Sequence, residues 1–343
     1  MPFPGTCSLP ISDGSARTAE PGRAISRQAD REEWWSAVYS DGSIITQRDD
    51  GAGDADSGRG TPTSSLSAPG VVAEFLELLD VRPRHRVLEI GTGTGWTAAL
   101  LGRMGADVTT VEIDPVIAEQ AAVNLKAVGA TARLMVGDGA AGEPRGMPYD
   151  RVHSTCAVAR VPYAWVEQTR PGGVIVTPWQ PVPGYGWKLR LTVEGSRAVG
   201  RFHGPAGYMM LRAQRTAARW NPHHAAGAVT SRTRLDPRAI TRNGPGTILA
   251  IIVRCPGVGL FPVDNDDGSF SLLLFEAGDP EGAWASCDWD PGSAEYEVTQ
   301  YGERTLWDEV EAAFRWWVAA GSPGEERFRV TVDARGERLS LQK

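Results

Sequence analysis

The stretch VLEIGTGTGWTAAL, from Val87 to Leu100, decides the fold class of this 343-residue chain. An apolar run ends in glycines at alternate positions, Gly91, Gly93 and Gly95, and a second apolar run follows. This order is typical of a buried strand, a tight turn and a helix. Such a turn directs backbone N–H groups and a helix N-terminus toward a ligand. The stretch therefore predicts a ligand site at the carboxyl end of a parallel strand.

The neighbouring sequence repeats this order of strand and helix. A helix is predicted over 68–80, and β-like and helical runs then alternate, which predicts an α/β fold with a mostly parallel sheet and helices on both faces. Later β-like runs, among them TILAIIVRC (Thr247–Cys255), surround one long helix. We therefore expect a flexible leader over 1–29, an α/β domain over 30–235 and an additional C-terminal α+β domain over 236–343. We also expect a mobile loop at the acidic, glycine-rich residues 49–59.

Composition limits the partners. The net charge of -7 argues against a general binder of nucleic acid. No apolar run approaches the ~20 residues that cross a bilayer, and the N-terminal residues lack the order of a signal peptide, so we expect a cytoplasmic protein without a membrane partner. The four cysteines are scattered and the histidines lack ligand spacing, so we expect reduced thiols and no metal.

Residues around the turn indicate the ligand. Trp96 stands where a dinucleotide fingerprint has its third glycine, which disfavours a dinucleotide. Glu112 ends the next strand, where a carboxylate accepts from ribose hydroxyls. Glu89 would repel phosphate and could face an ammonium or sulfonium group, and Asp138-Gly139 ends a third strand where an adenine amino group can be met. Together these strand ends predict S-adenosylmethionine.

Four segments resemble the protein-L-isoaspartate O-methyltransferases over about residues 61 to 180, and weakly to about 215. They are SSLSAPGVVAEFLELL (Ser64–Leu79), RVLEIGTGTGWTAALL, VGDG and YDRVHSTCAVARVPYAWVEQTRPGGVIVTP (Tyr149–Pro178). The resemblance implies a Rossmann-like S-adenosylmethionine-dependent methyltransferase fold. It also implies an enzyme that methylates a carboxylate of an aspartyl or isoaspartyl residue in a peptide or protein, after which the ester collapses to a succinimide.

The resemblance also assigns residues. Ser67 matches the family's active-site serine, beside the donor's methyl group, and a plain helix N-cap is the alternative role for it. The expected cofactor-binding residues are Ser64, Ser65, Leu66, Glu89, Gly91, Thr92, Gly93, Gly95, Glu112, Asp138 and Gly139. A serine hydroxyl and the N–H groups of a helix start are suited to orienting a carboxylate.

The chain departs from the family in several places. Gly70 replaces the usual histidine, and GYMMLRAQR (Gly207–Arg215) replaces a proline-containing strand, so no role is transferred to Arg212 or Gln214. The C-terminal residues and the tryptophan pairs at 34–35 and 316–317 are not explained by protein repair. Extended relatives methylate an aspartate in ribosomally made peptides, and we favour that function. Generic isoaspartyl repair, a small-molecule methyltransferase and a non-catalytic S-adenosylmethionine sensor or scaffold remain alternatives.

Overall fold

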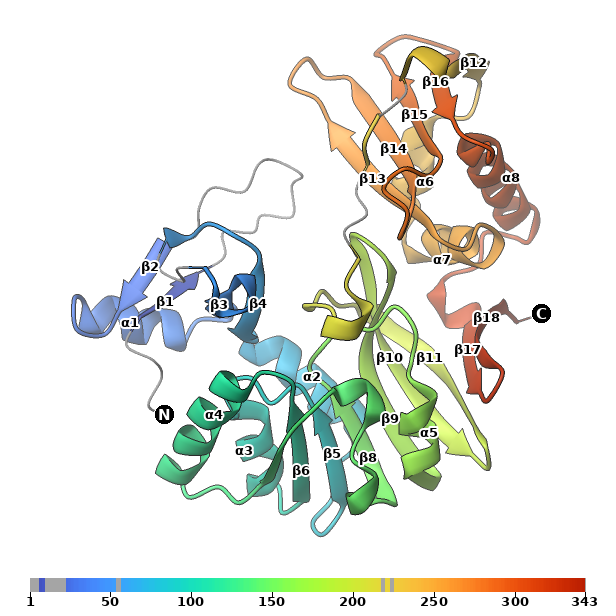
Figure 1. Cartoon of the computed structure of the whole chain (residues 1–343). Helices are drawn as coiled ribbons and strands as arrows, with labels where there is room; N and C mark the ends of the chain where they lie inside the picture. The colour runs from blue at the N-terminus through green and yellow to red at the C-terminus, as the bar shows by residue number, and fades with distance from the viewer. Residues whose placement is uncertain (1–5, 10–22, 54–56, 217–219, 223–224, 343) are drawn as a thin grey trace.

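A computed structural model describes residues 6–9, 23–53, 57–216, 220–222 and 225–342, which form three sheets (Figure 1). In Figure 1 the large central sheet is drawn at the bottom, with the N-terminal sheet above it at the left and the C-terminal sheet above it at the right. No helix among the described residues is long and apolar enough to span a membrane.

The central sheet has nine strands in the order β18-β17-β11-β10-β9-β8-β5-β6-β7. Its parallel part runs from β7 to β9, as the alternating pattern predicted, and the remaining strands extend it in antiparallel pairs. The strands are β5 (Arg86–Ile90), β6 (Asp107–Glu112), β7 (Arg133–Val136), β8 (Tyr149–Ser154), β9 (Thr169–Val182), β10 (Tyr185–Glu194), β11 (Arg197–Pro205), β17 (Phe328–Asp333) and β18 (Gly336–Leu341).

Helices cover both faces of this sheet. Val87 packs in one buried cluster with residues of α2 (Pro69–Leu79), α3 (Trp96–Arg103) and α4 (Pro115–Ala127). Its neighbour Leu88 points to the opposite face and packs in a second cluster with α5 (Tyr163–Gln168). The helix predicted over 68–80 is confirmed as α2. The predicted α/β architecture, with helices on both faces of the sheet, is thereby confirmed.

The N-terminal sheet contradicts part of the expected flexible leader. Its strands are β1 (Thr6–Leu9), β2 (Arg23–Ser26), β3 (Ile44–Arg48) and β4 (Pro62–Leu66), and α1 (Arg31–Val38) packs on it. Ile25 and Trp34 are each 1% exposed, because together they form the core that orders this segment. Residues 1–5 and 10–22 of the expected leader lie outside the described residues.

The loop expected at 49–59 is anchored at its ends. Thr61 N donates to Asp49 Oδ1 at 2.7 Å, and Asp50 pairs with arginines of a distant segment described below. Residues 54–56 lie outside the described part of the chain, so the mobility expected for them stays a prediction.

The C-terminal sheet has the order β12-β16-β15-β14-β13. It contains β12 (Val229–Thr233), β13 (Val258–Asp264), β14 (Phe270–Glu276), β15 (Trp284–Trp289) and β16 (Tyr296–Tyr301), with α6 (Pro237–Arg242), α7 (Pro245–Arg254) and α8 (Leu306–Ala319). The β-like prediction for TILAIIVRC was wrong, since this segment belongs to α7. Pro245 occupies the first helical turn, and residues 246–251 are all buried, so packing overrides the β-branched composition.

The sheets divide the chain differently from the expected boundary at 235/236. β12 precedes that boundary yet pairs with β16, and the chain's last hairpin, β17–β18, returns to β11 of the central sheet. Without the hairpin, β11 would be an open edge. The extent of the domains stays a prediction, but the C-terminal residues contribute to both sheets.

Glu337 of β18 should anchor the returning hairpin. Its Oε1 accepts from Trp179 Nε1 at 2.9 Å and its Oε2 from Val161 N at 2.8 Å. Glu337→Ala removes both acceptors and should lower the free energy of unfolding by about 2 kcal/mol in urea denaturation. Glu194→Ala, which breaks only an exposed pair with Arg197, is the control and should change it by less than about 0.5 kcal/mol. Equal effects of the two variants would contradict the anchoring role.

Candidate functional site

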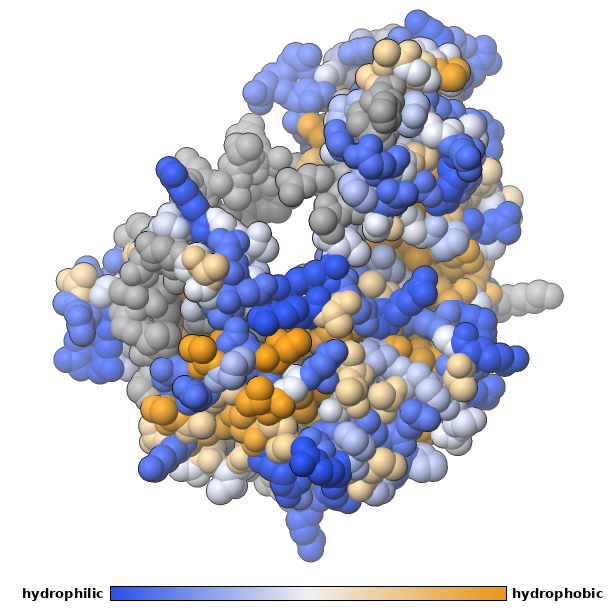
Figure 2. All heavy atoms as spheres, viewed as in Figure 1, coloured by the Kyte–Doolittle hydropathy of each residue, from blue (hydrophilic) through white to orange (hydrophobic). Residues whose placement is uncertain are grey.

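A cleft of about 910 Å³ lies at the carboxyl ends of the parallel strands. It is bordered by the glycine turn after β5, by the turn between β4 and α2, and by the segment from Pro205 to Arg215. Figure 2 shows the face between the N-terminal sheet and the C-terminal part hollowed at this level. The cleft therefore brings together three segments that are distant in the sequence.

The glycine turn has the backbone that its composition predicted. Gly91, Gly93 and Gly95 have φ values of +87°, +54° and +82°, in the region that favours glycine. A Cβ atom on Gly91 would lie 2.6 Å from Thr155 Oγ1 and 2.7 Å from Cys156 Sγ. The turn thus requires glycine for its backbone conformation. It also requires glycine because the segment at Thr155 and Cys156 approaches it closely.

Trp96 follows the turn and begins α3. Its partly buried side chain packs against the core of the N-terminal sheet, together with Trp35 and Val38. A tryptophan is therefore accommodated where a dinucleotide fingerprint has glycine, and it joins the N-terminal sheet to the glycine turn.

Glu112 lies beside the turn, as the sequence predicted. Its Oε2 accepts from Gly93 N at 2.9 Å and its Oε1 from Asp114 N at 3.1 Å. The side chain is only 6% exposed but borders the cleft. A carboxylate has further lone pairs, so the expected bond to ribose hydroxyls remains available to it and stays a prediction.

Asp138 and Gly139 form a third wall of the cleft. Asp138 Oδ1 accepts from Ala140 N at 2.9 Å, which fixes the carboxylate. A Cβ on Gly139 would lie 2.4 Å from Ile90 Cγ2, so only glycine fits there.

The position of Glu89 differs from the expected one. Its side chain is fully buried and lies outside the lining of the cleft, so it does not face a sulfonium group there. Its Oε2 accepts from Thr110 Oγ1 at 2.6 Å, and Thr110 Oγ1 lies 2.6 Å from Thr92 Oγ1. Burial raises the pKa of Glu89 to about 8. Glu89 thus supports the glycine turn from beneath, through two hydroxyl groups.

The serine turn lies on the other side of the cleft. Ser64, Ser65 and Ser67 border it, and Ser64 Oγ accepts from Thr46 Oγ1 at 3.1 Å. Leu66 borders the cleft too, but it is 5% exposed and packs in the N-terminal core. The turn is therefore held by β4 pairing with β3.

Ser67 is not the N-cap of α2. That position belongs to Ala68, which makes no side-chain capping bond, so the alternative role as a plain N-cap was wrong. The side chain of Ser67 borders the cleft instead.

Gly70 is explained by its neighbour Asp41. Gly70 N donates to Asp41 Oδ1 at 2.7 Å, and a Cβ on Gly70 would lie 2.7 Å from Asp41 Oδ2. The carboxylate of Asp41 therefore occupies the first turn of α2. A histidine at position 70 would require Asp41 to move.

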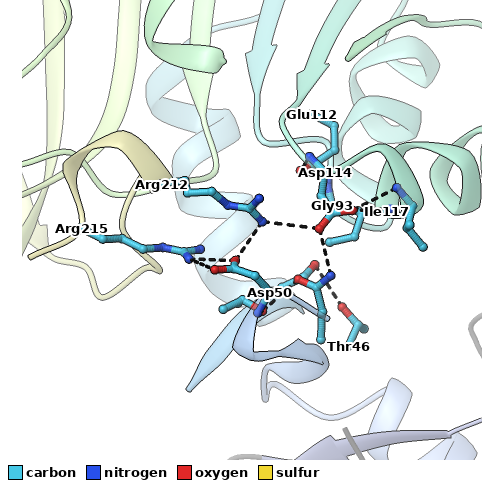
Figure 3. A network of polar contacts seen from close by, with 12 residues as sticks. Thr46, Asp50, Gly93, Glu112, Asp114, Ile117, Arg212 and Arg215 are labelled. Atoms are coloured by element: carbon cyan, nitrogen blue, oxygen red, sulfur yellow. Dashed lines mark hydrogen bonds and ion pairs between the residues drawn. The ribbon is translucent and has the colours of Figure 1, made fainter. Parts of the chain in front are cut away.

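Sequence reasoning missed an ion-pair network at the rim of the cleft (Figure 3). Arg215 Nη1 lies 2.8 Å from both carboxyl oxygens of Asp50, and Arg212 Nη2 lies 2.8 Å from Asp50 Oδ1 and 3.4 Å from Asp114 Oδ2. Gln47 Nε2 also donates to Asp114 Oδ2, at 3.1 Å. The network joins the N-terminal sheet to the glycine-turn side of the cleft. Its partners are far apart in the chain, so no local pattern indicated it.

Gln214 has a different role from its neighbours. Its Oε1 accepts from Ala159 N at 2.7 Å and Arg160 N at 3.0 Å, and its Nε2 donates to Arg160 O at 2.9 Å. These bonds satisfy its amide and fix the segment that borders the cleft. Arg212 and Arg215 line the cleft itself.

Comparisons with known proteins agree with this geometry. A family model described as protein-L-isoaspartate(D-aspartate) O-methyltransferase matches residues 26–191. A protein-L-isoaspartate O-methyltransferase of Methylorubrum populi is 41% identical over 148 residues, which cover 43% of this chain and 69% of that protein. The chain belongs to the protein-L-isoaspartate O-methyltransferase family. Members of this family are S-adenosylmethionine-dependent methyltransferases, which accords with the cofactor that the strand ends predicted.

Further matches agree. The relative from Methylorubrum extorquens is 40% identical over 43% of this chain and 64% of its own length. A solved structure of a protein-L-isoaspartate O-methyltransferase matches 90% of this chain and 89% of its own, with a TM-score of 0.52 and 20% identity. The fold similarity therefore extends into the C-terminal residues. Among the described residues no group of three or more histidine, cysteine or acidic side chains is placed to hold a metal ion.

The raised pKa of Glu89 predicts a pH dependence of stability. The unfolded chain releases this proton near its ordinary pKa, whereas the folded chain retains it to about pH 8, so this group makes stability fall as pH rises between those values. Glu89→Gln removes the titration. The unfolding free energy of the variant, taken relative to that of the native chain, should rise by about 3 kcal/mol between pH 5 and pH 8, measured in urea. Parallel pH profiles of the two proteins would contradict this.

The ion pairs of Asp50 should slow cofactor release. Asp50→Asn weakens both arginine contacts and should accelerate release of S-adenosylhomocysteine by about three- to tenfold in stopped-flow displacement. Added salt should accelerate release from the native chain more than from the variant, because salt screens exposed charges. The matched control is Asp264→Asn, which breaks the exposed pair with Arg242 in the C-terminal part. Equal release rates in all three proteins would show that the network does not hold the cofactor.

Proposed function

We propose that this chain transfers a methyl group from S-adenosylmethionine to a side-chain or isoaspartyl carboxylate of an aspartyl or isoaspartyl residue in a peptide or protein. The observation that carries the proposal is the position of Ser67 in the same cleft as the glycine turn, Glu112 and Asp138. A group that orients a carboxylate thus borders the space that the donor would occupy. Family membership supports the same reaction.

The residues of the cleft fit the donor. The glycine turn, Glu112 and Asp138 border one cleft, and a Cβ on Gly91 or Gly139 would clash with neighbouring side chains of the chain itself. When bound, S-adenosylmethionine supplies a methyl carbon on a sulfonium sulfur, which keeps the electron pair of the broken S–C bond as the new O–C bond forms. The backbone N–H groups of the turn and Glu112 would hold the nucleoside part.

The acceptor needs positioning more than activation. An ionised carboxylate oxygen is already a nucleophile, so no proton has to be removed before the O–C bond forms. Ser67 would donate its hydroxyl proton in a hydrogen bond to the acceptor carboxylate and hold it in line with the methyl group. Outside the enzyme, the next backbone nitrogen attacks the ester carbonyl, loses its proton and expels methanol, giving the succinimide.

For the acceptor itself we favour a ribosomally made peptide. The segment from Tyr208 to Arg215, which departs from the family's pattern, lines the cleft, and this supports a substrate other than damaged protein in general. The tryptophan pairs no longer contribute to this argument. Trp34 and Trp317 are buried in cores, at 1% and 6% exposure.

Generic isoaspartyl repair is the second candidate. One observation favours it: a solved protein-L-isoaspartate O-methyltransferase shares the fold over 90% of this chain. The residues beyond the methyltransferase core are therefore compatible with a protein-L-isoaspartate O-methyltransferase. The acceptor, rather than the fold, has to decide between the candidates.

Methyl transfer to three peptides tests the proposal. Purified protein and labelled donor are incubated with a linear isoaspartyl peptide, its aspartyl counterpart and a cyclic aspartyl peptide. We expect ester formation on the cyclic peptide, and Ser67→Ala should lower its kcat/KM by about 10- to 100-fold while donor affinity stays within about twofold. Ser293→Ala, in an exposed turn of the C-terminal part, is the control.

The outcomes separate the candidates. Labelling of the linear isoaspartyl peptide alone would contradict the peptide-maturation assignment and support repair. Donor binding in calorimetry without an ester on any carboxylate would contradict methyl transfer and support a sensor or scaffold.

A further inference from the structure

The antiparallel part of the central sheet carries three arginines in one row across neighbouring strands. Arg190 of β10 is the register partner of Arg201 of β11. Arg329 of β17 continues the row, because it stands two positions before Thr331, the partner of Val199 on β11. Side chains that are opposite one another on adjacent strands lie on the same face of a sheet. Arg190, Arg201 and Arg329 are called the arginine row below.

The arginine row begins beside α2 and leaves the helix behind. Arg190 is the register partner of Val176, which packs in the buried cluster of α2. Its Nε donates to Leu78 O, near the end of α2, at 2.9 Å, and this bond holds the guanidinium in place. One strand farther from the helix, Arg201 is exposed. The row is therefore fixed at one end and accessible beyond it.

The positive charge of the arginine row is not balanced within the chain. Among the described residues, none of its three guanidinium groups forms an ion pair with a carboxylate. Glu74 pairs with Lys188, and Glu325 Oε1 accepts from Gly204 N at 2.8 Å, so these carboxylates beside the row are engaged. Like charges directly opposite each other destabilise a sheet, and the whole chain is acidic, with a net charge of -7. Folding gives no reason for the row, whereas binding of a negatively charged partner does.

The same charges act on His203, two residues after Arg201 in β11. Partial burial, followed by the positive charges of Arg190, Arg201 and Lys188, lowers the pKa of this histidine. A negatively charged group bound at the arginine row would oppose that effect. The pKa of His203 is therefore a local reporter for such binding.

The arginine row is continuous with the cleft. At the end of the β10–β11 ladder Ala206 N donates to Gly186 O at 2.9 Å, and both residues line the cleft. Arg190 lies four residues from Gly186, and Arg201 lies five from Ala206. At ~3.3 Å per strand residue, the row is roughly 15 Å from this wall. An extended peptide spans that distance with about five residues.

We propose that the arginine row is a docking surface for an acidic segment of the peptide substrate, which holds the peptide while its aspartyl or isoaspartyl residue occupies the cleft. The inference rests on the proposed function, because it concerns the peptide that is methylated. Guanidinium groups bind carboxylates through paired N–H donors, and neighbouring strands present them about 4.8 Å apart. The segment that fits is a run of glutamates or aspartates about five residues from the acceptor.

Peptides with charged tails test the docking surface. The acceptor peptide that is labelled best in the methyl-transfer assay is extended by a spacer of four glycines and then four glutamates, or by the same spacer and four glutamines. The tail precedes the acceptor in one pair and follows it in a second pair. In at least one pair the native chain should have a KM about tenfold lower for the glutamate tail, with kcat within about twofold, because docking binds ground state and transition state alike. Equal KM values in both pairs would overturn the proposal.

Substitutions at Arg201 test the row itself. Arg201→Gln should reduce the preference for the glutamate tail at least about threefold, and Arg201→Glu should favour a lysine tail instead. Both remove a like-charge contact, so the variants should fold as the native chain does. The matched control is Arg234→Gln, which removes an arginine that pairs with Glu295 in the C-terminal part and should keep the native preference. A native preference in both Arg201 variants would overturn the docking role.

Binding measured without transfer separates this inference from the proposed function. Fluorescence anisotropy with S-adenosylhomocysteine present should show tighter binding of the glutamate tail than of the glutamine tail, and added salt should remove the difference. In an NMR titration the glutamate-tailed peptide should raise the pKa of His203. A native chain that shows this preference but forms no ester would overturn the proposed function and leave the docking surface standing.

Other polyanions are tested in the same assay. A single-stranded RNA or vesicles of anionic lipid should bind no more tightly than the glutamate-tailed peptide. Tighter binding of either one, weakened by Arg201→Gln but not by Arg234→Gln, would overturn the assignment of the row to a peptide.

Discussion

The close packing of the backbone around Gly91 is the constraint on which the rest of the site depends. The turn approaches Thr155 and Cys156 so closely that a Cβ on Gly91 would overlap both side chains. Thr155 Oγ1 donates back to Gly91 O, which ties the end of β5 to the end of β8. β5 lies in the middle of the parallel strands, so this contact fixes the central turn of the cleft relative to β8.

Two glutamates support the turn in different ways. Glu112 accepts from two backbone N–H groups at the edge of the cleft, whereas the fully buried Glu89 receives only the Thr110 hydroxyl and leaves its Oε1 without a hydrogen-bond partner among the described residues. An ionised carboxylate is costly in such a place, which is why the pKa of Glu89 is raised. Glu112 thus holds the turn on the side that faces the cleft, and Glu89 supports it from the buried side.

Local patterns predicted the parts of this site that depend on neighbours in the sequence. The strand before Gly91, α2 and the end of β6 at Glu112 follow from apolar periodicity and turn residues. The contacts that complete the cleft do not: Asp50 meets Arg215 and Asp41 meets Gly70 only after the N-terminal sheet docks. In α7 the local pattern gave a wrong prediction. Its β-branched composition favoured a strand, but residues 246–251 are all buried and tertiary packing makes the segment a helix.

The C-terminal residues are part of the same packed body as the cleft. One continuous cluster of buried side chains runs from Leu88 and Ile90 of β5 through Trp179 of β9 to Leu274 of β14 and Trp307 of α8. Trp179 is the residue whose indole donates to Glu337 of the final strand, and its neighbour Gln180 borders the cleft. Displacing the C-terminal hairpin would therefore disturb β9 within one residue of the site. The C-terminal strand and the cleft thus share β9 as a common support.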